Sequence, residues 1–383
     1  MALLHREERG AVVKVVFVSG VSVGGSARST RELAGALARR GHDVTVVLGR
    51  PRPAWADRVF QRGVNAWVKL EPGPASVPVL AALRWVGHGS AAVVDDTSGA
   101  DVRLAFVPEN AYLEFLDPRP DAVVVSSTWR APWRWIRADL DRRAIPSVLY
   151  VREDHALSHL TVSDAPPDVL VANAEAHATR LAAAGHEAVV LPSVIDRTAS
   201  AIESTRRTVL LVNPVPEHRV DLVDALAQAR PDIPFVLQES WPLEPDARAE
   251  VDRVVGARSN VEFRPRVDDP TDLYRDARIL FAPYPSGRPR VVPEAQHNGI
   301  PVLAATQPAL AEAVGDGGAL VDLDAPASVW LDALAALWDD DARYADLSHR
   351  AREHDRRPEL DPDHIAERFE VLLAGASATG AGR

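Results

Sequence analysis

The sequence predicts an α/β protein of two consecutive domains, each organised around a doubly wound parallel sheet. Its 383 residues exceed what one hydrophobic core usually organises. In both halves, short β-branched runs alternate with helical segments, which is typical of parallel strands joined by right-handed crossovers. A break at residues 192–196, followed by the polar stretch 197–207, separates the halves. Ligands of such sheets bind beyond the carboxyl ends of the strands, so the predicted site is the cleft between the two facing sheets.

The first half opens with its clearest unit. Val12–Ser19 is an apolar, β-branched run that predicts a buried strand. A helix is predicted to follow, with Ser29 and Glu32 as a capping box and Gly41 at its C-terminal end. Val44–Leu48 predicts the next strand. Later strands of this half are predicted at Asp121–Ser126, Ser147–Val151, Asp168–Val171 and Ala188–Leu191, with helices near Trp129–Arg143 and Glu175–Ala184.

The second half restarts the same alternation. Its predicted strands are Thr208–Val212, Phe235–Gln238, Asn260–Phe263, Ile279–Ala282, Pro301–Ala304 and Ala319–Val321, and its predicted helices include Asp221–Ala229, Asp246–Val255 and Pro326–Trp338. We therefore predict a first domain over residues 1–196, a linker over 197–207 and a second domain over 208–360. A C-terminal helix over 361–374, which can return to the first domain, precedes a tail over 375–383 that is expected to be disordered.

Composition excludes several functional classes. The net charge of −11 argues against general nucleic-acid binding, which needs a basic face. The absence of cysteine excludes disulfides, cysteine-ligated zinc and thiol catalysis. Residues 1–10 lack the apolar core of a signal peptide, and no apolar run reaches the roughly 18–20 residues of a membrane span. We therefore expect a cytoplasmic protein, and the bias toward Ala, Arg, Asp, Pro and Val indicates a GC-rich bacterial genome.

A glycine loop precedes the first helix. Gly24 and Gly25 let the backbone approach a ligand closely, and the following helix offers free N–H groups and the positive end of its dipole. This arrangement suits a phosphate. A tight strand-to-helix turn would use the same glycines, and the loop by itself does not distinguish the two roles.

A proline-rich loop follows the predicted strand Ile279–Ala282, and a short helix then opens at Pro293. Glu294 stands in its first turn, where the helix dipole stabilises an acidic side chain. Its carboxylate could also accept hydrogen bonds from the hydroxyl groups of a ribose, because both oxygens are acceptors. Stabilisation of the helix end and ribose binding are equally compatible with this position.

The same segment resembles the second-domain signature of retaining family 4 glycosyltransferases. That pattern has an acidic residue, seven further residues, a second Glu-Ala and then Gly-x-Pro-Val. The matching stretches, in one order over nearly the whole chain, are Gly24-Gly25, Gly41–Val44, Leu191–Asp196, Glu294-Ala295, Gly299–Val302 and Ala313–Gly318. The resemblance implies a GT-B fold, with two facing Rossmann-like domains, and a donor-binding role for Gly24, Gly25 and Glu294.

Several positions depart from the family pattern. The first acidic residue of the signature falls at Ser286. The Arg and the Lys-Gly with which the family holds the donor diphosphate fall at Asn213 and at His218-Arg219. A cation could come from Arg219, or from His218 if a nearby phosphate keeps it protonated.

Two further arginines could supply the missing charge. Arg288 and Arg290 lie close before Glu294, and an arginine can bind a phosphate through two N–H groups. Solvated surface positions are the alternative for both.

Charged residues after the predicted strand Ser147–Val151 form a third candidate site. The resemblance places Arg152 where many family members have a histidine near the reacting sugar, so Arg152 could contact the sugar or the acceptor. Glu153 or His155 could accept a proton. A charged surface loop is the alternative, and it is favoured for His155.

The segment Trp129–Arg143 mixes tryptophan with arginine, which would suit a membrane interface or a polyanionic acceptor. Inward packing of Trp129, Trp133 and Ile136, with solvated arginines, is favoured. Peripheral membrane contact therefore stays open.

The resemblance implies a glycosyltransferase that transfers a sugar from a nucleoside diphosphate sugar to a small-molecule or glycan acceptor. Retention of configuration is implied, and neither a cofactor nor a metal is expected. Two alternatives stay open because Asn213, His218 and Ser286 are altered. One is a pseudo-glycosyltransferase or a sugar-nucleotide epimerase on the same fold, and the other is a non-catalytic partner protein.

Overall fold

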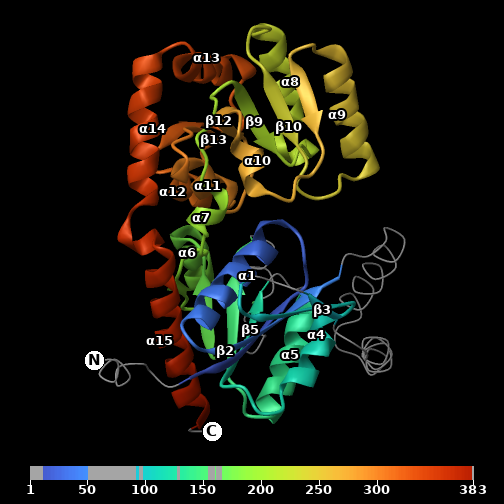
Figure 1. The fold of residues 1–383 in the computed structure, drawn as a ribbon, viewed down its shortest axis with the longest axis vertical. Coiled ribbons are helices and arrows are strands. Elements are labelled where there is room, and N and C mark those ends of the chain that lie inside the picture. Colours follow the sequence, from blue (N-terminus) through green and yellow to red (C-terminus); the bar gives the residue numbers. More distant parts are fainter. Residues whose placement is uncertain are drawn as a thin grey trace, which may run out of the picture.

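The computed structural model describes residues 12–50, 92–94, 98–126, 130–153, 160 and 166–381. These residues form two α/β domains stacked along the long axis of the molecule (Figure 1). Each domain has its own sheet of mainly parallel strands, so the predicted fold class is confirmed.

The sheet of the first domain has eight strands in the order β3-β4-β2-β1-β5-β6-β7-β8. They are β1 (Lys14–Ser19), β2 (Asp43–Gly49), β3 (Ala92–Val94), β4 (Asp101–Ala105), β5 (Ala122–Ser126), β6 (Ser147–Val151), β7 (Val169–Ala172) and β8 (Val189–Val190). Only β3 runs antiparallel to its described neighbour. The central strands are apolar on both faces, and every residue of β5 and β6 is buried, because helices cover a parallel sheet from both sides.

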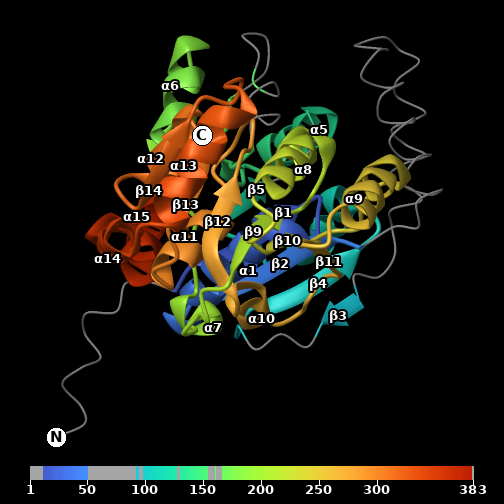
Figure 2. The ribbon, with the colours of Figure 1, turned by 90° about the horizontal axis from the view of Figure 1, so that it is seen from above.

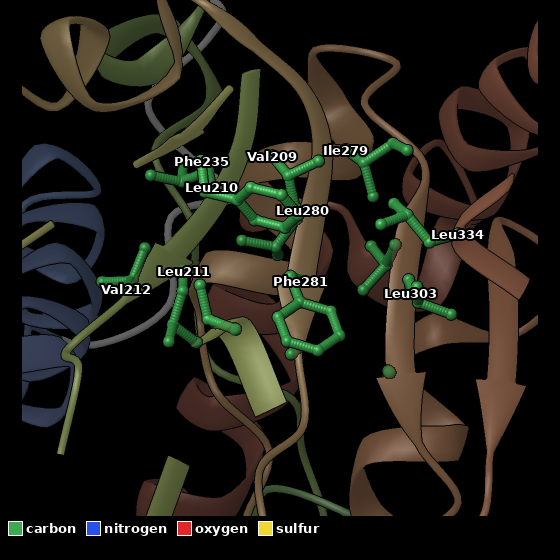
Figure 3. Close-up of a cluster of buried hydrophobic side chains, with 14 of the residues drawn as sticks. Val209, Leu210, Leu211, Val212, Phe235, Ile279, Leu280, Phe281, Leu303 and Leu334 are labelled. Atoms are coloured by element: carbon green, nitrogen blue, oxygen red, sulfur yellow. The ribbon is translucent and has the colours of Figure 1, made fainter. Parts of the chain in front are cut away.

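The sheet of the second domain has six strands in the order β11-β10-β9-β12-β13-β14, and its strand pairs are parallel. They are β9 (Thr208–Val212), β10 (Phe235–Gln238), β11 (Val261–Arg264), β12 (Ala277–Ala282), β13 (Val302–Ala305) and β14 (Gly318–Val321). Figure 3 shows the side chains of β9, β10, β12 and β13 in the core of this domain. Phe281 packs edge-on against Trp330 at 5.4 Å between ring centroids, which joins the sheet to α13.

Helices cover both sheets. The described helices of the first domain are α1 (Gly24–Arg39), α4 (Pro108–Ala111), η1 (Tyr112–Phe115), α5 (Arg130–Arg142) and α6 (Glu175–Ala183). The helices from the interdomain segment onward are α7 (Arg197–Ser200), η3 (Pro216–His218), α8 (Val220–Ala229), α9 (Pro245–Ala257), α10 (Pro270–Tyr274), α11 (Val291–His297), α12 (Pro308–Val314), α13 (Ala327–Trp338), α14 (Asp341–Asp355), η4 (Pro358–Leu360) and α15 (Pro362–Ala381). In the view from above, α6 of the first domain lies on the same side as α12 of the second, and the two helices are in contact (Figure 2).

In both sheets the strand order reverses next to the first strand of the domain. β1 lies between β2 and β5, and β9 lies between β10 and β12. Ligands of doubly wound sheets bind at the carboxyl ends of the strands, at such switch points. α1 follows β1 and α11 follows β12, so both candidate loops leave the sheets at these positions.

The last helix returns from the second domain to the first. α15 runs along the first domain (Figure 1), where Phe369 stacks on Phe17 at 6.0 Å and on Tyr150 at 6.2 Å between ring centroids. Arg40 of α1 also donates to Glu370 through Nε at 2.5 Å. The chain thus passes between the domains twice, and the contacts of α15 with the first domain hold the returning segment in place.

Three features differ from the sequence-based expectations. The linker predicted over 197–207 contains α7, because Asp196 caps the amides of Thr198 and Ala199. The tail expected to be disordered from residue 375 is helical to Ala381, and the burial of Ala376 shows that this turn packs on the protein. α14 was not predicted from the sequence, because its apolar face is narrow.

In the part of the chain that the structure describes, none of the helices combines the length and the apolar character needed to cross a membrane.

Because α15 packs on the first domain, shortening the side chain of Phe369 should cause a large loss of stability. Phe369→Ala should reduce the free energy of unfolding by about 3–5 kcal/mol, because it leaves a cavity between two aromatic rings. Val371→Ala, in the same helix at a position that is 71% exposed, should cost less than about 0.5 kcal/mol. Urea unfolding followed by circular dichroism measures both, and equal midpoints would show that α15 does not support the first domain.

Candidate active site at the domain interface

The start of α1 meets second-domain side chains across the interface. Gly24 has a φ of +85°, and a Cβ built there would lie 3.7 Å from Cε3 of Trp241. A Cβ at Gly25 would lie 3.1 Å from Cγ and 3.2 Å from Cδ of Arg290. Gly24 is therefore required by its positive φ, and Gly25 gives room for the side chain of Arg290 on the first turn of the helix.

This end of α1 is suited to an anion. The helix begins at Gly24 and not at the predicted cap, Ser29. Val23, which precedes the helix, provides no side-chain cap, and the first turn has no acidic residue. The first amide groups and the positive end of the helix dipole are thus available to a negatively charged group.

Ser29 and Glu32, predicted as a capping box, lie inside α1. Because residues three apart share one face of a helix, both point to the same side, and that side meets the second domain. Arg290 donates to Oγ of Ser29 at 3.1 Å and to both oxygens of Glu32 at 2.8 and 2.9 Å. The predicted cap is therefore wrong, and these residues form a contact between the domains.

Four charged side chains form a closed cycle between the domains, which we name the charge ring. Arg28 and Glu32 belong to α1, and Arg290 and Glu294 lie at the start of α11. The successive N–O distances are 2.8 Å for Arg28–Glu32, 2.8 Å for Glu32–Arg290, 2.6 Å for Arg290–Glu294 and 3.3 Å for Glu294–Arg28. Each arginine contacts both carboxylates. Because two positive and two negative side chains take part, the ring has no net charge.

Arg290 is the most heavily used member of the ring. All three of its guanidinium nitrogens donate, Nε to Glu294 and the terminal nitrogens to Ser29 and Glu32. Burial alone would lower the pKa of Arg290, but the carboxylates of Glu294 and Glu32 outweigh it and raise the pKa. Arg290 therefore stays charged, and the solvated surface position considered from the sequence does not apply.

Glu294 is 1% exposed, and its carboxylate accepts from three donors. Oε2 accepts from the hydroxyl of Tyr274 at 2.5 Å, and Oε1 contacts Arg290 and Arg28. Burial by itself would raise the pKa of Glu294, yet Arg290 and Arg28 lower it below the ordinary value. Since a carboxylate has about four lone-pair positions, roughly one acceptor position is left for another donor such as a ribose hydroxyl.

Arg288 makes a second contact between the domains. Its Nη1 donates to the carbonyl oxygen of Asn173, beyond β7, at 2.8 Å and to Glu312 at 3.2 Å. Glu312 in turn accepts from the backbone amide of Ala176, in the first turn of α6, at 3.4 Å. Burial lowers the pKa of Arg288, which Glu312 partly offsets. Arg288 and Arg290 thus lie on one loop and contact two different parts of the first domain.

Arg152 is a buried cation without an acidic hydrogen-bond partner among the described residues. It follows β6, is 5% exposed, and donates to the carbonyl oxygen of Ser26 and to Oγ1 of Thr30, both in α1. Its guanidinium carbon lies 4.0 Å from the centre of the Tyr150 ring, and its Nε has no partner. Burial lowers the pKa of Arg152. Tyr150 and Glu153 partly offset this effect of burial. Because its hydrogen-bond acceptors are neutral and its Nε has no partner, the guanidinium is still suited to receive an anion.

Asn213 and His218 contact the loop that carries Trp241 and the Trp241 ring. Oδ1 of Asn213 accepts from the backbone amides of Ser240 and Trp241 at 2.9 and 3.2 Å, so its side chain holds that loop. Nδ1 of His218 donates to the carbonyl oxygen of Asn213 at 2.6 Å, and its ring lies 4.4 Å from that of Tyr284. Burial lowers the pKa of His218. The sequence offered His218 as a cation only beside a phosphate, and burial disfavours its charged form in the structure.

Arg219 and Ser286 lie apart from the charge ring. Arg219 has a φ of +58°, which explains why the family pattern has glycine there. Its side chain donates to Asp221 and to the carbonyl oxygen of Leu323, within the second domain. Ser286 is exposed in the loop before Arg288. Neither side chain contacts the start of α1.

The remaining predicted residues have different outcomes. Glu153 follows Arg152 and is half-buried, whereas His155 and Trp129 lie outside the described residues. Trp133 and Ile136 are fully buried, so the predicted inward packing of this helix is confirmed for them.

Sequence reasoning missed the partners of the predicted residues. Arg28, Glu32, Tyr274 and Trp241 complete the site, and none belongs to a matching family motif. Only the spacing of Ser29 and Glu32 carried a signal, since a shared helix face can bind a partner as well as form a cap.

Family models cover both domains. A Glycosyl transferase 4-like domain matches residues 24–193, and Glycosyl transferases group 1 matches residues 206–340. The chain belongs to the group 1 glycosyltransferases. The gap between the two matches falls on the interdomain segment that contains α7.

Curated relatives of this group 1 glycosyltransferase include two from bacteria. The D-inositol 3-phosphate glycosyltransferase of Corynebacterium glutamicum is 35% identical over 151 residues, which are 37% of this chain and 36% of the relative. The enzyme of the same name from Corynebacterium efficiens is 38% identical over 124 residues, 30% of this chain and 29% of the relative. The chain thus matches about a third of the length of these relatives.

Solved structures share the fold over nearly the whole chain. A sucrose-phosphate synthase from Thermosynechococcus elongatus has a TM-score of 0.72 at 13% identity and covers 96% of this chain and 100% of its own. Anabaena HepE in complex with UDP and glucose has a TM-score of 0.68 at 16% identity, covering 94% and 99%. AviGT4, involved in avilamycin A biosynthesis, has a TM-score of 0.60 at 19% identity, covering 96% and 98%. These similarities support the predicted GT-B fold.

The charge ring predicts an acid-sensitive loss of stability at Glu294. Its pKa is lower in the folded protein than the ordinary value of 4.5, so its contribution is complete above that pH and is lost as the pH falls through the folded-state pKa. Glu294→Gln should cost about 3 kcal/mol at pH 7, because a buried charge pair is broken, and the cost should shrink below pH 4.

Glu262→Gln is the matched control, since Glu262 is 54% exposed in its pair with Arg264. It should change stability by less than about 0.5 kcal/mol at either pH. Thermal unfolding at pH 7 and at pH 3 measures both variants, and a cost at Glu294 that is the same at both pH values would contradict the assigned charge state.

Proposed function

We propose that this group 1 glycosyltransferase moves a sugar from a nucleoside diphosphate donor to a phosphorylated small-molecule acceptor in the cytoplasm. The observation that carries the proposal is the meeting of the uncapped start of α1 with buried Arg290, at the switch points of the two sheets. Anabaena HepE, a neighbour in fold, is known in complexes with UDP and with UDP-glucose. Its fold similarity makes a nucleotide sugar the natural donor class.

In the proposed reaction the bond between the anomeric carbon and the diphosphate oxygen breaks, and the electron pair leaves with the diphosphate. The amides of Gly24 and Gly25 and the guanidinium of Arg290 would stabilise that developing charge. Arg288, on the same loop, would add a second cation. These protein groups, and not a metal ion, are assigned the task.

The acceptor oxygen forms the new bond to the anomeric carbon and loses its proton, for which Glu153 is the proposed recipient. We propose retention of configuration from the family resemblance, and NMR of the product would test it. Glu294 would offer its remaining acceptor position to a ribose hydroxyl. Contact between the domains would exclude water and limit hydrolysis of the donor.

The altered second-domain residues serve the same site indirectly in this proposal. Asn213 holds the loop of Trp241, and Trp241 lies against Gly24. His218 packs against Trp241 and Tyr284, and we propose that it is neutral. The positive charge that the family draws from these positions would here come from Arg288 and Arg290.

Donor binding is tested by thermal shift with UDP, GDP, dTDP and ADP and their common sugar conjugates. One nucleotide should stabilise the protein by about 2.7 kcal/mol at a hundredfold excess over its Kd, and Arg290→Gln should abolish most of that shift. Glu262→Gln should leave it unchanged. No shift with any nucleotide would reject the proposed donor and favour a non-catalytic partner protein.

Product analysis then separates transfer from related reactions. A new glycosidic bond in the product supports the proposal, whereas an isomerised sugar nucleotide or a coupled cyclitol would identify an epimerase or a pseudo-glycosyltransferase.

Arg152 is the proposed site for the acceptor's phosphate. The curated relatives are named for D-inositol 3-phosphate, and Arg152 is the buried cation without an acidic hydrogen-bond partner among the described residues. Because a hydrogen bond to a charged group contributes about 1.5–3 kcal/mol, Arg152→Met should reduce the preference for D-inositol 3-phosphate over inositol by about tenfold to a hundredfold. Arg152→Lys, which retains the charge, should lose less. An unchanged ratio of kcat/KM values would exclude this role.

A further inference from the structure

We propose that Glu32 competes with the donor's diphosphate for Arg290, so that donor binding exchanges one anion for another on a single guanidinium. This inference rests on the proposed function, because it concerns the same diphosphate site. Glu32 is a first-domain residue outside the family motifs. In this proposal it decides whether Arg290, in the second domain, is available to the diphosphate.

The charge ring offers no net attraction to a diphosphate. Two arginines and two carboxylates cancel, and every nitrogen of the Arg290 guanidinium already donates to an oxygen. A diphosphate that approached the intact ring would meet two carboxylates at short range in a site of low dielectric. Arg290 can therefore serve the diphosphate only after one carboxylate has left it.

Glu294 is not the carboxylate that leaves. It follows Arg290 by four residues at the start of the same short helix, so both move together with the second domain. Tyr274, also of the second domain, donates to it at 2.5 Å. No movement between the domains separates these three groups.

Glu32 can leave at a small cost. A movement between the domains would break its bonds to Arg290 and would keep its bonds to Arg28, at 2.8 Å, and to the amide of Asp196, at 3.0 Å. Arg28 and the amide would still compensate its charge, so no buried carboxylate is left unpaired. Arg290 keeps its pair with Glu294 and regains the terminal N–H groups that Glu32 now occupies, while its Cγ and Cδ lie against Gly25, on the first turn of α1.

The exchange links donor binding to the domain interface. The diphosphate would take the place of Glu32 on the guanidinium of Arg290, which lies beside the start of α1. Glu32 therefore sets how tightly the donor binds, and it is a positioning residue because it acts through Arg290.

Glu32→Gln tests the exchange, because it removes the charge and keeps the size and one acceptor oxygen. Inorganic pyrophosphate and UDP are titrated calorimetrically into the wild type and the variant at constant ionic strength. Both ligands should bind about tenfold tighter to E32Q, a coupling of ordinary size. Glu370→Gln is the matched control, since it removes the same charge from a pair with Arg40 at the other end of α1, and its affinities should equal those of the wild type.

Two further variants identify the cause. The gain should disappear in E32Q/R290Q, because it requires the Arg290 guanidinium, and E32D, which shortens the reach to Arg290, should show a smaller gain. Equal or weaker binding of pyrophosphate to E32Q would overturn the inference, as would a gain that survives R290Q or no binding of pyrophosphate to either protein. Tighter pyrophosphate binding without binding of any nucleoside diphosphate would instead reject the proposed donor and support the exchange.

Discussion

The charge ring between α1 and α11 is the constraint on which the rest of the interface depends. Arg290 and Glu294 are buried, and the side chains of Arg28 and Glu32 are only 25% and 13% exposed. Removing ionised groups from water costs more than a single ion pair returns. The arrangement is stable because each guanidinium contacts two carboxylates and each carboxylate contacts two guanidiniums. The ring therefore holds only when both domains contribute, which couples the charge state of the site to the arrangement of the domains.

The ring also explains why glycine stands at the start of α1. The aliphatic part of Arg290 crosses the helix at Gly25, where a Cβ would lie only 3.1 Å from it. A larger residue would push the guanidinium away from Ser29 and Glu32. The glycine that suggests a phosphate loop in the sequence thus serves a side chain of the other domain, and phosphate binding would use the same opening.

Buried arginines give this acidic protein a local positive character. The net charge of −11 describes the whole chain, whereas Arg152 and Arg290 are buried, and Arg288 is 10% exposed, around the start of α1 and the ends of β6 and β7. Of these, Arg290 is neutralised within the ring and Arg288 pairs with Glu312. Arg152, whose charge the nearby Glu153 partly compensates, donates only to neutral acceptors among the described residues. The interface thus has one site whose charges cancel, the charge ring, and one cation, Arg152, without an acidic hydrogen-bond partner among the described residues.

The sequence by itself determined the two-sheet α/β architecture. Runs such as those of β1, β5 and β9 are apolar except at their ends, and that pattern is typical of strands that are covered on both faces. The order of the family motifs singled out Gly24, Gly25 and Glu294, which the structure has at the starts of α1 and α11. It also identified Arg290 as a candidate cation, because an arginine near an acidic helix start is a local feature of the chain.

Only the tertiary structure decided what these residues contact. Glu32 lies more than 250 residues from Arg290 in the sequence, and no local pattern carries a pairing over that distance. Its spacing from Ser29 fits a helix cap as well as a domain contact, and the observed start of α1 decided between them. The surroundings of His218 and Arg219 were decided in the same way: burial lowers the pKa of His218, and Arg219 has a left-handed backbone and contacts its own domain. Local spacing fixes which residues share a helix face or a strand end, whereas burial and charge compensation arise from residues that only folding brings together.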